Sequence, residues 1–147
     1  MITFQLQTEI DAPPEVVFDL LADHTKHPLW DPHMIEARLD TERPIGKGSR
    51  GATVGEFRDR RVENEVFYDA YDRPEYVSGG TTSGTIEAKN SVRFIPPARG
   101  TRIDFRMEVK FKGLMRLMEP FIKSSLIEQR KESLEPFKDY VRNHPVP

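Results

Sequence analysis

Residues 23–33 (DHTKHPLWDPH) hold the densest group of side chains in the chain that could do acid–base or metal chemistry. The group consists of His24, His27, His33, Asp23 and Asp31. Histidine and carboxylate side chains bind zinc and similar metals, and histidine exchanges protons near neutral pH. Two prolines interrupt the segment, so no regular helix presents these side chains together. We expect a short helix or turn at about residues 26–30, with the histidines solvated and no bound metal; a metal or catalytic role is the alternative.

Two asparagines interrupt strand-like runs that are otherwise apolar at alternating positions. They are Asn64, in the run 62–66, and Asn90, in the run 86–94. A buried amide is costly unless it finds a hydrogen-bond partner, and a cavity offers a ligand or ordered water. We therefore predict that Asn64 and Asn90 contact a ligand, with pairing to neighbouring strands as the alternative. Tyr68 and Tyr76 are predicted to present their hydroxyls inward in the same way.

Bulky and soft apolar side chains form the second group of candidate ligand contacts. Trp30 is the only tryptophan, and its segment either walls a pocket or is anchored to the core by the large indole. The other predicted contacts are Phe105, Met107, Met118, Phe121 and Ile122. Methionine adapts to irregular ligand surfaces, although such residues also serve as ordinary core.

Several kinds of catalytic site are excluded by what the sequence lacks. The chain has no cysteine, which excludes disulfides, thiolate nucleophiles and Cys-based metal sites. It also has no G-x-S-x-G, no H-E-x-x-H and no glycine-rich phosphate loop. We expect no cofactor. No catalytic residue is nominated, although a dry pocket could shift the pKa of a buried acid and so permit acid–base chemistry.

Composition is that of an ordinary soluble chain. The 147 residues include 22 Lys and Arg against 24 Asp and Glu, for a formal net charge of −2, and the mean hydropathy is −0.60. The interspersed signs provide no broad basic field for nucleic acid or for an anionic membrane. No apolar stretch approaches the roughly 18 residues of a spanning helix, and the N-terminus lacks the pattern of a signal peptide. We expect a cytoplasmic protein with no membrane insertion.

The periodicity predicts one α+β domain over residues 1–147, with a frayed tail at about 143–147. A strand at about 2–10 precedes a helix at about 14–22, which starts at the prolines Pro13 and Pro14. Residues 34–111 show no helical period and predict about six strands, with Gly79-Gly80 as one of the turns. Residues 114–141 predict a helix, with a lead-in turn before Pro120 and a bend near Pro136.

The last two strands alternate most clearly. Even positions of 86–94 and odd positions of 101–111 are apolar except for Asn90 and Thr101, and most of their neighbours are charged, as in an antiparallel sheet with one buried face. Together with the apolar stripe at 114–122, these faces are predicted to wall a cavity of low polarity between the sheet and the C-terminal helix.

The chain resembles the START-like polyketide cyclase/dehydrase group, often called SRPBCC. The resemblance rests on five segments: residues 10–23 (IDAPPEVVFDLLAD), Pro28-Leu29-Trp30, Gly46-Lys47-Gly48, Gly100-Thr101-Arg102, and residues 112–120 (KGLMRLMEP). It implies a helix-grip fold, in which a curved antiparallel sheet of about seven strands wraps around a long C-terminal helix. Two short helices follow the first strand, and a hydrophobic cavity lies between sheet and helix.

Members of this group bind lipids, sterols, polyketides and plant hormones, and some are cyclases or dehydratases. The resemblance therefore implies that the chain binds a small hydrophobic or amphipathic molecule, such as a lipid, polyketide or aromatic compound. A cyclase or dehydratase that uses acid–base residues in the same cavity is the alternative. A protein-interaction role with a vestigial cavity is a third possibility, without support from any exposed apolar stripe. Either a monomer or a homodimer is compatible with the sequence.

Overall fold

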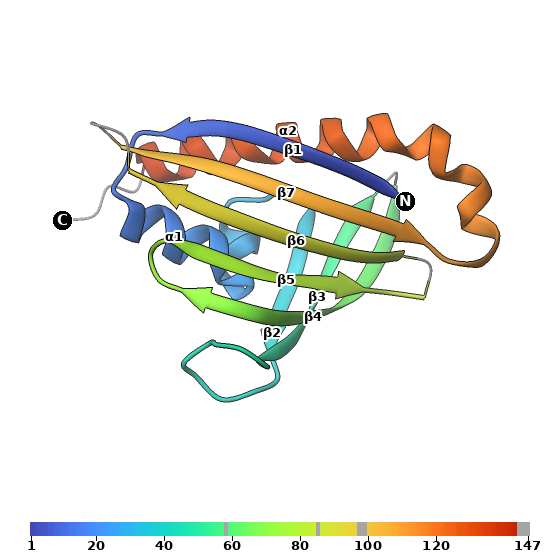
Figure 1. Cartoon of the computed structure of the whole chain (residues 1–147), viewed down its shortest axis with the longest axis horizontal. Coiled ribbons are helices and arrows are strands. Elements are labelled where there is room, and N and C mark those ends of the chain that lie inside the picture. Colours follow the sequence, from blue (N-terminus) through green and yellow to red (C-terminus); the bar gives the residue numbers. More distant parts are fainter. Residues whose placement is uncertain (58, 85, 97–99, 144–147) are drawn as a thin grey trace.

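The structure, a computed structural model, describes residues 1–57, 59–84, 86–96 and 100–143. A seven-stranded antiparallel sheet carries two helical segments after its first strand and a long helix at its C-terminal end (Figure 1). The strands are β1 (Ile2–Ile10), β2 (Met34–Leu39), β3 (Arg50–Phe57), β4 (Arg60–Asp72), β5 (Tyr76–Thr82), β6 (Ile86–Ile95) and β7 (Thr101–Phe111). The helices are α1 (Pro14–Ala22), the 3₁₀ helices η1 (His24–Leu29) and η2 (Gly113–Met118), and α2 (Glu119–Asn143).

The strand order is β1-β7-β6-β5-β4-β3-β2, so the first strand pairs with the last and the rest follow as a meander. Ile2 lies opposite Val109, and Val109 lies opposite Ala88 on the next strand. All three are buried, which fixes the even positions of β1 and β6 and the odd positions of β7 on the inner face. This alternation and the helix-grip architecture confirm the prediction from sequence.

The two helical segments after β1 close one end of the inner face. Pro14 occupies the first turn of α1, where its missing N–H costs no hydrogen bond. Val17 and Phe18 are fully buried, and the Phe18 ring packs edge-on against Tyr71 and Phe94. The helix is therefore held to the sheet by packing between aromatic rings.

The segment that follows α1 forms the second short helix that the sequence predicts, but it is not solvated throughout as expected. Residues 24–29 form η1, and the His24 side chain is only 4% exposed. Asp23 caps this 3₁₀ helix by accepting a hydrogen bond from the Thr25 amide at 3.0 Å. A short 3₁₀ helix tolerates Pro28 better than an α-helix would, so the prolines do not prevent packing against the sheet.

Gly79 and Gly80 lie inside β5 and not in a turn, which corrects the sequence prediction. Each is buried, and a Cβ at Gly79 would overlap the Phe67 carbonyl oxygen and lie 3.0 Å from the Tyr68 Cα. Glycine inside a strand marks a close approach of neighbouring backbone. Here it allows β4 to lie close to β5 where β4 has a register shift, between Tyr68 and Ala70.

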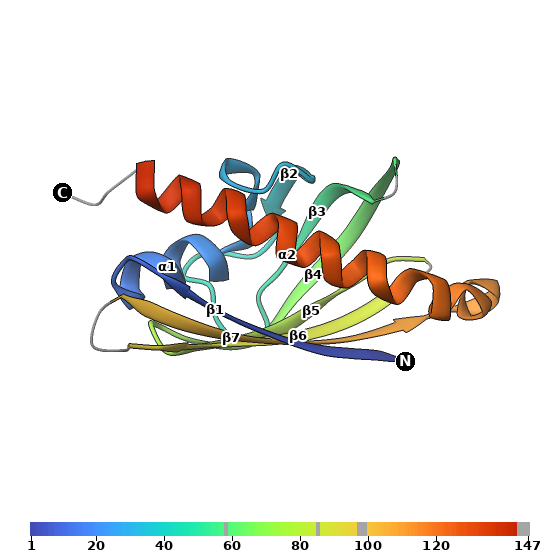
Figure 2. The same cartoon turned by 90° about the horizontal axis from the view of Figure 1, so that it is seen from above.

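The C-terminal region has the predicted lead-in turn, η2, followed by a long helix that begins beside Pro120. α2 runs across the inner side of the sheet and buries Ile122, Phe137 and Val141 against it (Figure 2). The expected inward stripe at 114–122 is wrong for most of its members, because η2 lies beyond the ends of the strands, where no sheet face remains to cover it. Four of its side chains are exposed: Leu114, Leu117, Met118 and Phe121.

The core divides into two clusters. The larger joins α1, η1 and the C-terminal half of α2 to the middle of the sheet, around Phe18, Trp30 and Phe137. The smaller joins β1, β6 and β7 to the start of α2, around Met107 and Ile122. Phe105 packs against both clusters and so connects them. In the part of the chain that the structure describes, no helix is long and apolar enough to cross a membrane.

Candidate functional site

Two small cavities lie side by side on the inner face of the sheet. One, of about 120 Å³, lies under α1 and η1 and is walled by β3 to β7. The other, of about 140 Å³, lies toward the start of α2 and reaches Leu126 of that helix. Met34 and Thr81 line both, so we treat the two as one site and call it the inner cavity.

The wall of the inner cavity is mainly apolar. Its apolar members include Trp30, Val66, Val77, Ala88, Val92, Phe105, Met107 and Val109. Trp30 satisfies both interpretations of its sequence position. Its indole N–H donates to the Leu20 carbonyl oxygen at 3.0 Å, and its ring packs edge-on against Phe137 at 4.8 Å, so it is anchored and also lines the cavity.

Two carboxamides point to this wall from the sheet. Asn64 of β4 lines the part of the inner cavity near α2, and Asn90 of β6 lines the part under η1. Both side chains are half-buried. Neither forms a side-chain hydrogen bond within the described residues. A half-buried amide without a protein partner retains two donors and an acceptor for whatever occupies the space beside it.

His24 and Tyr68 form a hydrogen-bonded pair at the end of the inner cavity that η1 covers. The Tyr68 hydroxyl lies 2.7 Å from His24 Nδ1 and 2.9 Å from the Ala22 carbonyl oxygen, and it accepts the His24 amide at 3.1 Å. The other ring nitrogen, Nε2, lies 2.7 Å from the Arg38 carbonyl oxygen. A Cβ at Gly51 would lie 2.5 Å from this Nε2, so a glycine there allows the imidazole to reach β2.

The single hydroxyl proton of Tyr68 has two competing acceptors, His24 Nδ1 and the Ala22 carbonyl oxygen. The Arg38 carbonyl oxygen only accepts, so Nε2 is the ring nitrogen that donates to it. The pair can therefore hold the hydroxyl proton in two arrangements.

Burial raises the pKa of the Tyr68 phenol far above its ordinary value of 10.0. Burial also raises the pKa of the neighbouring Tyr71 to about 12, with smaller contributions from the negative charges of Asp23 and Asp19. Both phenols consequently keep their protons at neutral pH, and the Tyr68 hydroxyl is placed to donate to the Ala22 carbonyl oxygen.

Asp23 anchors the segment that carries His24. Burial alone would raise the pKa of its carboxyl, but hydrogen bonds from Thr25 and the guanidinium of Arg43 outweigh burial and lower it. The Arg43 Nη1 lies 3.1 Å from the Asp23 carboxylate, and this pair links the loop before β3 to the start of η1. The carboxylate is thus ionised at neutral pH and positions η1 without lining the inner cavity.

The structure brings together six of the ten predicted ligand contacts and separates the others. Trp30, Asn64, Tyr68, Asn90, Phe105 and Met107 line the inner cavity. Ile122 is buried in the smaller core cluster. Tyr76 lies on the other face of the sheet with Arg93 stacked 4.7 Å above its ring, and Met118 and Phe121 are exposed on the far end of the molecule. Ligand contact stays a prediction for all ten.

Sequence reasoning missed His24, Met34 and Thr53, which also line the inner cavity. The available signal for His24 was its place directly after an apolar helical face, which brings it back toward the sheet. The other two histidines of the segment, His27 and His33, also line the inner cavity. Within the described residues, no three His, Asp or Glu side chains lie close enough to hold a metal ion.

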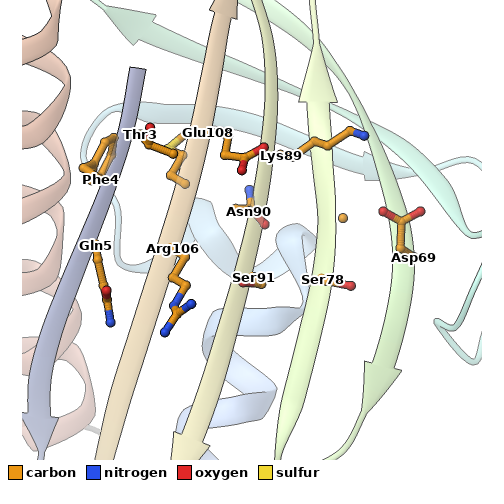
Figure 3. Close-up of a pocket in the computed structure, with 12 residues that line it drawn as sticks. Thr3, Phe4, Gln5, Asp69, Ser78, Lys89, Asn90, Ser91, Arg106 and Glu108 are labelled. Atoms are coloured by element: carbon orange, nitrogen blue, oxygen red, sulfur yellow. The ribbon is translucent and has the colours of Figure 1, made fainter. Parts of the chain in front are cut away.

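A much larger hollow lies on the opposite, outer face of the sheet. It measures about 550 Å³ and is lined mainly by polar and charged side chains from five neighbouring strands (Figure 3). Its labelled side chains include Gln5, Lys89, Arg106 and Glu108, which spread along the strands and do not converge on one point. Asn90 borders this hollow as well as the inner cavity, since the sheet is a single layer. The outer hollow is more open to solvent and its polar side chains do not converge, so the smaller, more enclosed inner cavity is the better candidate.

Comparison with known proteins decides the family. The family described as "Polyketide cyclase / dehydrase and lipid transport" matches residues 1–142. The chain belongs to this family. No curated protein sequence matches it.

Solved structures share the fold at low sequence identity. TTHA0849 from Thermus thermophilus is 15% identical with a TM-score of 0.83, covering 99% of this chain and all of the other. A START superfamily protein from Mycobacterium smegmatis is 12% identical with a TM-score of 0.83, covering 96% of this chain and 97% of that one. The di-domain ARO/CYC protein BexL from the BE-7585A biosynthetic pathway is 16% identical with a TM-score of 0.77, covering 98% of this chain and 51% of BexL. Family membership supports a ligand-binding or cyclase role for the chain.

Proposed function

We propose that this protein binds a small hydrophobic or amphipathic molecule in the inner cavity, between the sheet and the C-terminal helix. The observation that carries the proposal is the pair of carboxamides, Asn64 and Asn90, which have no side-chain partner among the described residues and lie on a mainly apolar wall. Apolar burial supplies affinity at roughly 25 cal/mol per Å², and a few placed polar groups supply orientation. The family's description, which includes lipid transport, supports the same function.

The size of the inner cavity favours a compact ligand. Its two parts measure about 120 and 140 Å³, below the roughly 300–1,000 Å³ of typical drug-sized pockets. A one- or two-ring aromatic compound with a hydroxyl or carbonyl group suits both the volume and the two amides. A longer chain would require α2 to move away from the sheet.

Thermal unfolding with small probe molecules tests this proposal. We expect 1-naphthol or indole to raise the unfolding temperature of the wild-type protein, because a ligand at about 100 times its Kd adds about 2.7 kcal/mol of stability. Native mass spectrometry of freshly purified protein then reports any bound molecule retained through purification. The absence of both a retained mass and a shift with a broad set of apolar probes would count against binding.

Matched variants show whether the amides take part. Asn64→Ala and Asn90→Ala should weaken probe binding about tenfold each, because an unfulfilled buried hydrogen bond costs about 1–3 kcal/mol. Ser91→Ala is the control: Ser91 is the neighbour of Asn90 on the outer face of β6 and lines the outer hollow instead. Equal affinities in Asn90→Ala and Ser91→Ala would contradict the assigned role of Asn90.

A second function, acid–base catalysis of the cyclase or dehydratase type, is favoured by the His24–Tyr68 pair. These groups line the same cavity and can hold one proton in two arrangements. General acid–base groups typically contribute about 10²- to 10⁴-fold to a rate. Tyr68→Phe and His24→Gln should then abolish turnover of a poly-β-ketone thioester while probe affinity is retained. Lost affinity without any turnover in the wild type would leave binding as the function.

A further inference from the structure

Four large apolar side chains stand exposed together at the start of the C-terminal helical region. Leu114, Leu117, Met118 and Phe121 are 86%, 74%, 44% and 70% exposed. They come from η2 and the first turn of α2, the part of the chain that projects beyond the ends of the strands (Figure 2). We call these four residues the apolar tip. Scattered exposed leucines are ordinary, but four large apolar side chains so close together in the sequence mark an interaction surface.

The charged residues around the apolar tip are mostly positive. Residues 112–123 carry three cations, Lys112, Arg116 and Lys123, and one carboxylate, Glu119, in a chain whose net charge is −2. Glu119 is half-buried and forms an ion pair with the α-amino group of Met1. Lys112 donates to the Ser83 carbonyl oxygen at 3.2 Å and shares a depression with Glu63 and Glu65. Arg116 and Lys123 are exposed and form no ion pair within the described residues.

We propose that the apolar tip docks on the surface of an anionic lipid membrane. Leucine, methionine and phenylalanine side chains on one short helical segment, with arginine and lysine beside them, are the composition of an interfacial membrane-binding element. The apolar side chains enter the boundary between headgroups and acyl chains. The long Arg116 and Lys123 side chains reach the lipid phosphates. This is contact with the surface only, because no described helix could span a bilayer.

The charge pattern favours a lipid surface over a second copy of the chain. A two-fold symmetric contact through the apolar tip would bring Arg116 and Lys123 of both copies into one interface. No unpaired carboxylate within residues 112–123 is available to neutralise them. Anionic phosphates neutralise the same cations directly.

The position of the tip adds a reason for such docking. Ile122, one residue after Phe121, is buried in the core cluster that contains Met107, and Leu126, one turn later, lines the inner cavity. A membrane held at the apolar tip would therefore lie at the end of the molecule next to the part of the cavity under α2. Docking does not depend on what the cavity binds, so the two proposals can fail separately.

Vesicle co-sedimentation of the full chain tests the proposal. We expect the wild type to bind phosphatidylcholine vesicles that contain phosphatidylglycerol, to bind pure phosphatidylcholine vesicles much more weakly, and to lose binding as salt rises. The Leu117→Ser/Phe121→Ser variant should bind roughly tenfold more weakly or worse. Arg116→Gln/Lys123→Gln should lose about fivefold for each charge removed.

Two matched controls separate the tip from exposed apolar or basic residues in general. Leu29→Ser removes a leucine that is 57% exposed on η1, and Lys47→Glu reverses an exposed cation in the loop between β2 and β3. Both should bind vesicles like the wild type. The substituted side chains are all exposed, and an unchanged unfolding temperature in each variant verifies that it folds.

Three results would overturn the proposal: no binding to anionic vesicles, equal binding in tip and control variants, or self-association that needs the tip while vesicles are ignored. The last result would identify the tip as an interface between copies. The tip variants should still bind 1-naphthol in water if the cavity binds it in the wild type. A wild-type protein that binds 1-naphthol but not vesicles would therefore contradict only the docking proposal. A wild-type protein that binds vesicles but not 1-naphthol or the other probes would contradict only the proposed function.

Discussion

At the scale of single residues, the polar groups of the inner face fall into two kinds. His24 and Tyr68 are buried and share their hydrogen bonds with each other and with backbone carbonyls. Asn64 and Asn90 are half-buried and have no side-chain partner among the described residues. The first kind holds η1 on the sheet, and the second kind is available to a ligand.

Alkaline titration tests the burial of the two inner phenols. Of the four tyrosines, Tyr68 and Tyr71 have raised pKa values, Tyr71 to about 12, because burial disfavours the phenolate. Phenolate absorbance of the folded protein should therefore develop in two steps, with these two groups ionising last. A single step near the ordinary value of 10.0 would contradict the packing of η1 on β4.

The same shifts predict how stability depends on pH. A group whose pKa is raised in the folded state contributes stability that is present below its unfolded value and is lost as pH rises above it. Stability should thus fall from about pH 10 upward as the unfolded phenols ionise. Tyr68→Phe should remove part of this dependence and, at neutral pH, cost about 1–3 kcal/mol of unfolding free energy, because the His24 and Ala22 groups lose their partner. Denaturant unfolding at several pH values measures both effects.

The sequence could predict some of these residues and not others. The inward positions of Asn64 and Asn90 could be predicted, because strand alternation alone places them between inward apolar neighbours. The role of His24 could not be predicted. Its burial depends on β2 and β3 lying beside it, with the Arg38 carbonyl and Gly51 next to its imidazole. Such contacts join residues far apart in the sequence, and no local pattern encodes them.

At the scale of elements, the periodicity of the sequence predicted most strands and helices. The two predictions that were wrong have separate causes. The β1, α1, β6 and β7 ranges were predictable because their apolar periods are strong. Gly79 and Gly80 were assigned to a turn since glycine usually breaks strands, whereas here β5 requires them for close backbone approach. The residues of the apolar tip belong to the apolar stripe that the sequence predicted to face inward. They are exposed because the strands end before them, and the stripe itself does not show where the strands end.

Substitution of the β5 glycines tests this explanation. Gly79→Ala should destabilise the protein by about 1–3 kcal/mol, because the added methyl group overlaps the backbone of β4. Gly84→Ala is the matched control, since an added Cβ there has no neighbour within 4 Å. Urea unfolding compares the two variants. Equal stabilities would show that β5 and β4 are not as close as the structure places them.

At the scale of the whole molecule, one curved sheet carries two surfaces of different character. Its inner face packs in two clusters with the inner cavity between them, and its outer face is polar and open. The helix α2 crosses the inner side and its buried side chains close the core, whereas η2 and the first turn of α2 carry the exposed apolar tip (Figures 1 and 2). The proposed ligand binding and the proposed membrane docking therefore involve different parts of the molecule.

The most direct test of ligand binding is a ¹H–¹⁵N NMR titration with 1-naphthol and the related small probes. Binding in the inner cavity predicts shifts of the side-chain amide signals of Asn64 and Asn90 and of the Trp30 indole signal, while the Gln5 amide on the outer face stays unchanged. Shifts confined to Gln5 and the backbone signals of Lys89 and Arg106 would place the ligand in the outer hollow. That outcome, or no shift with any probe, would contradict the inner cavity as the binding site.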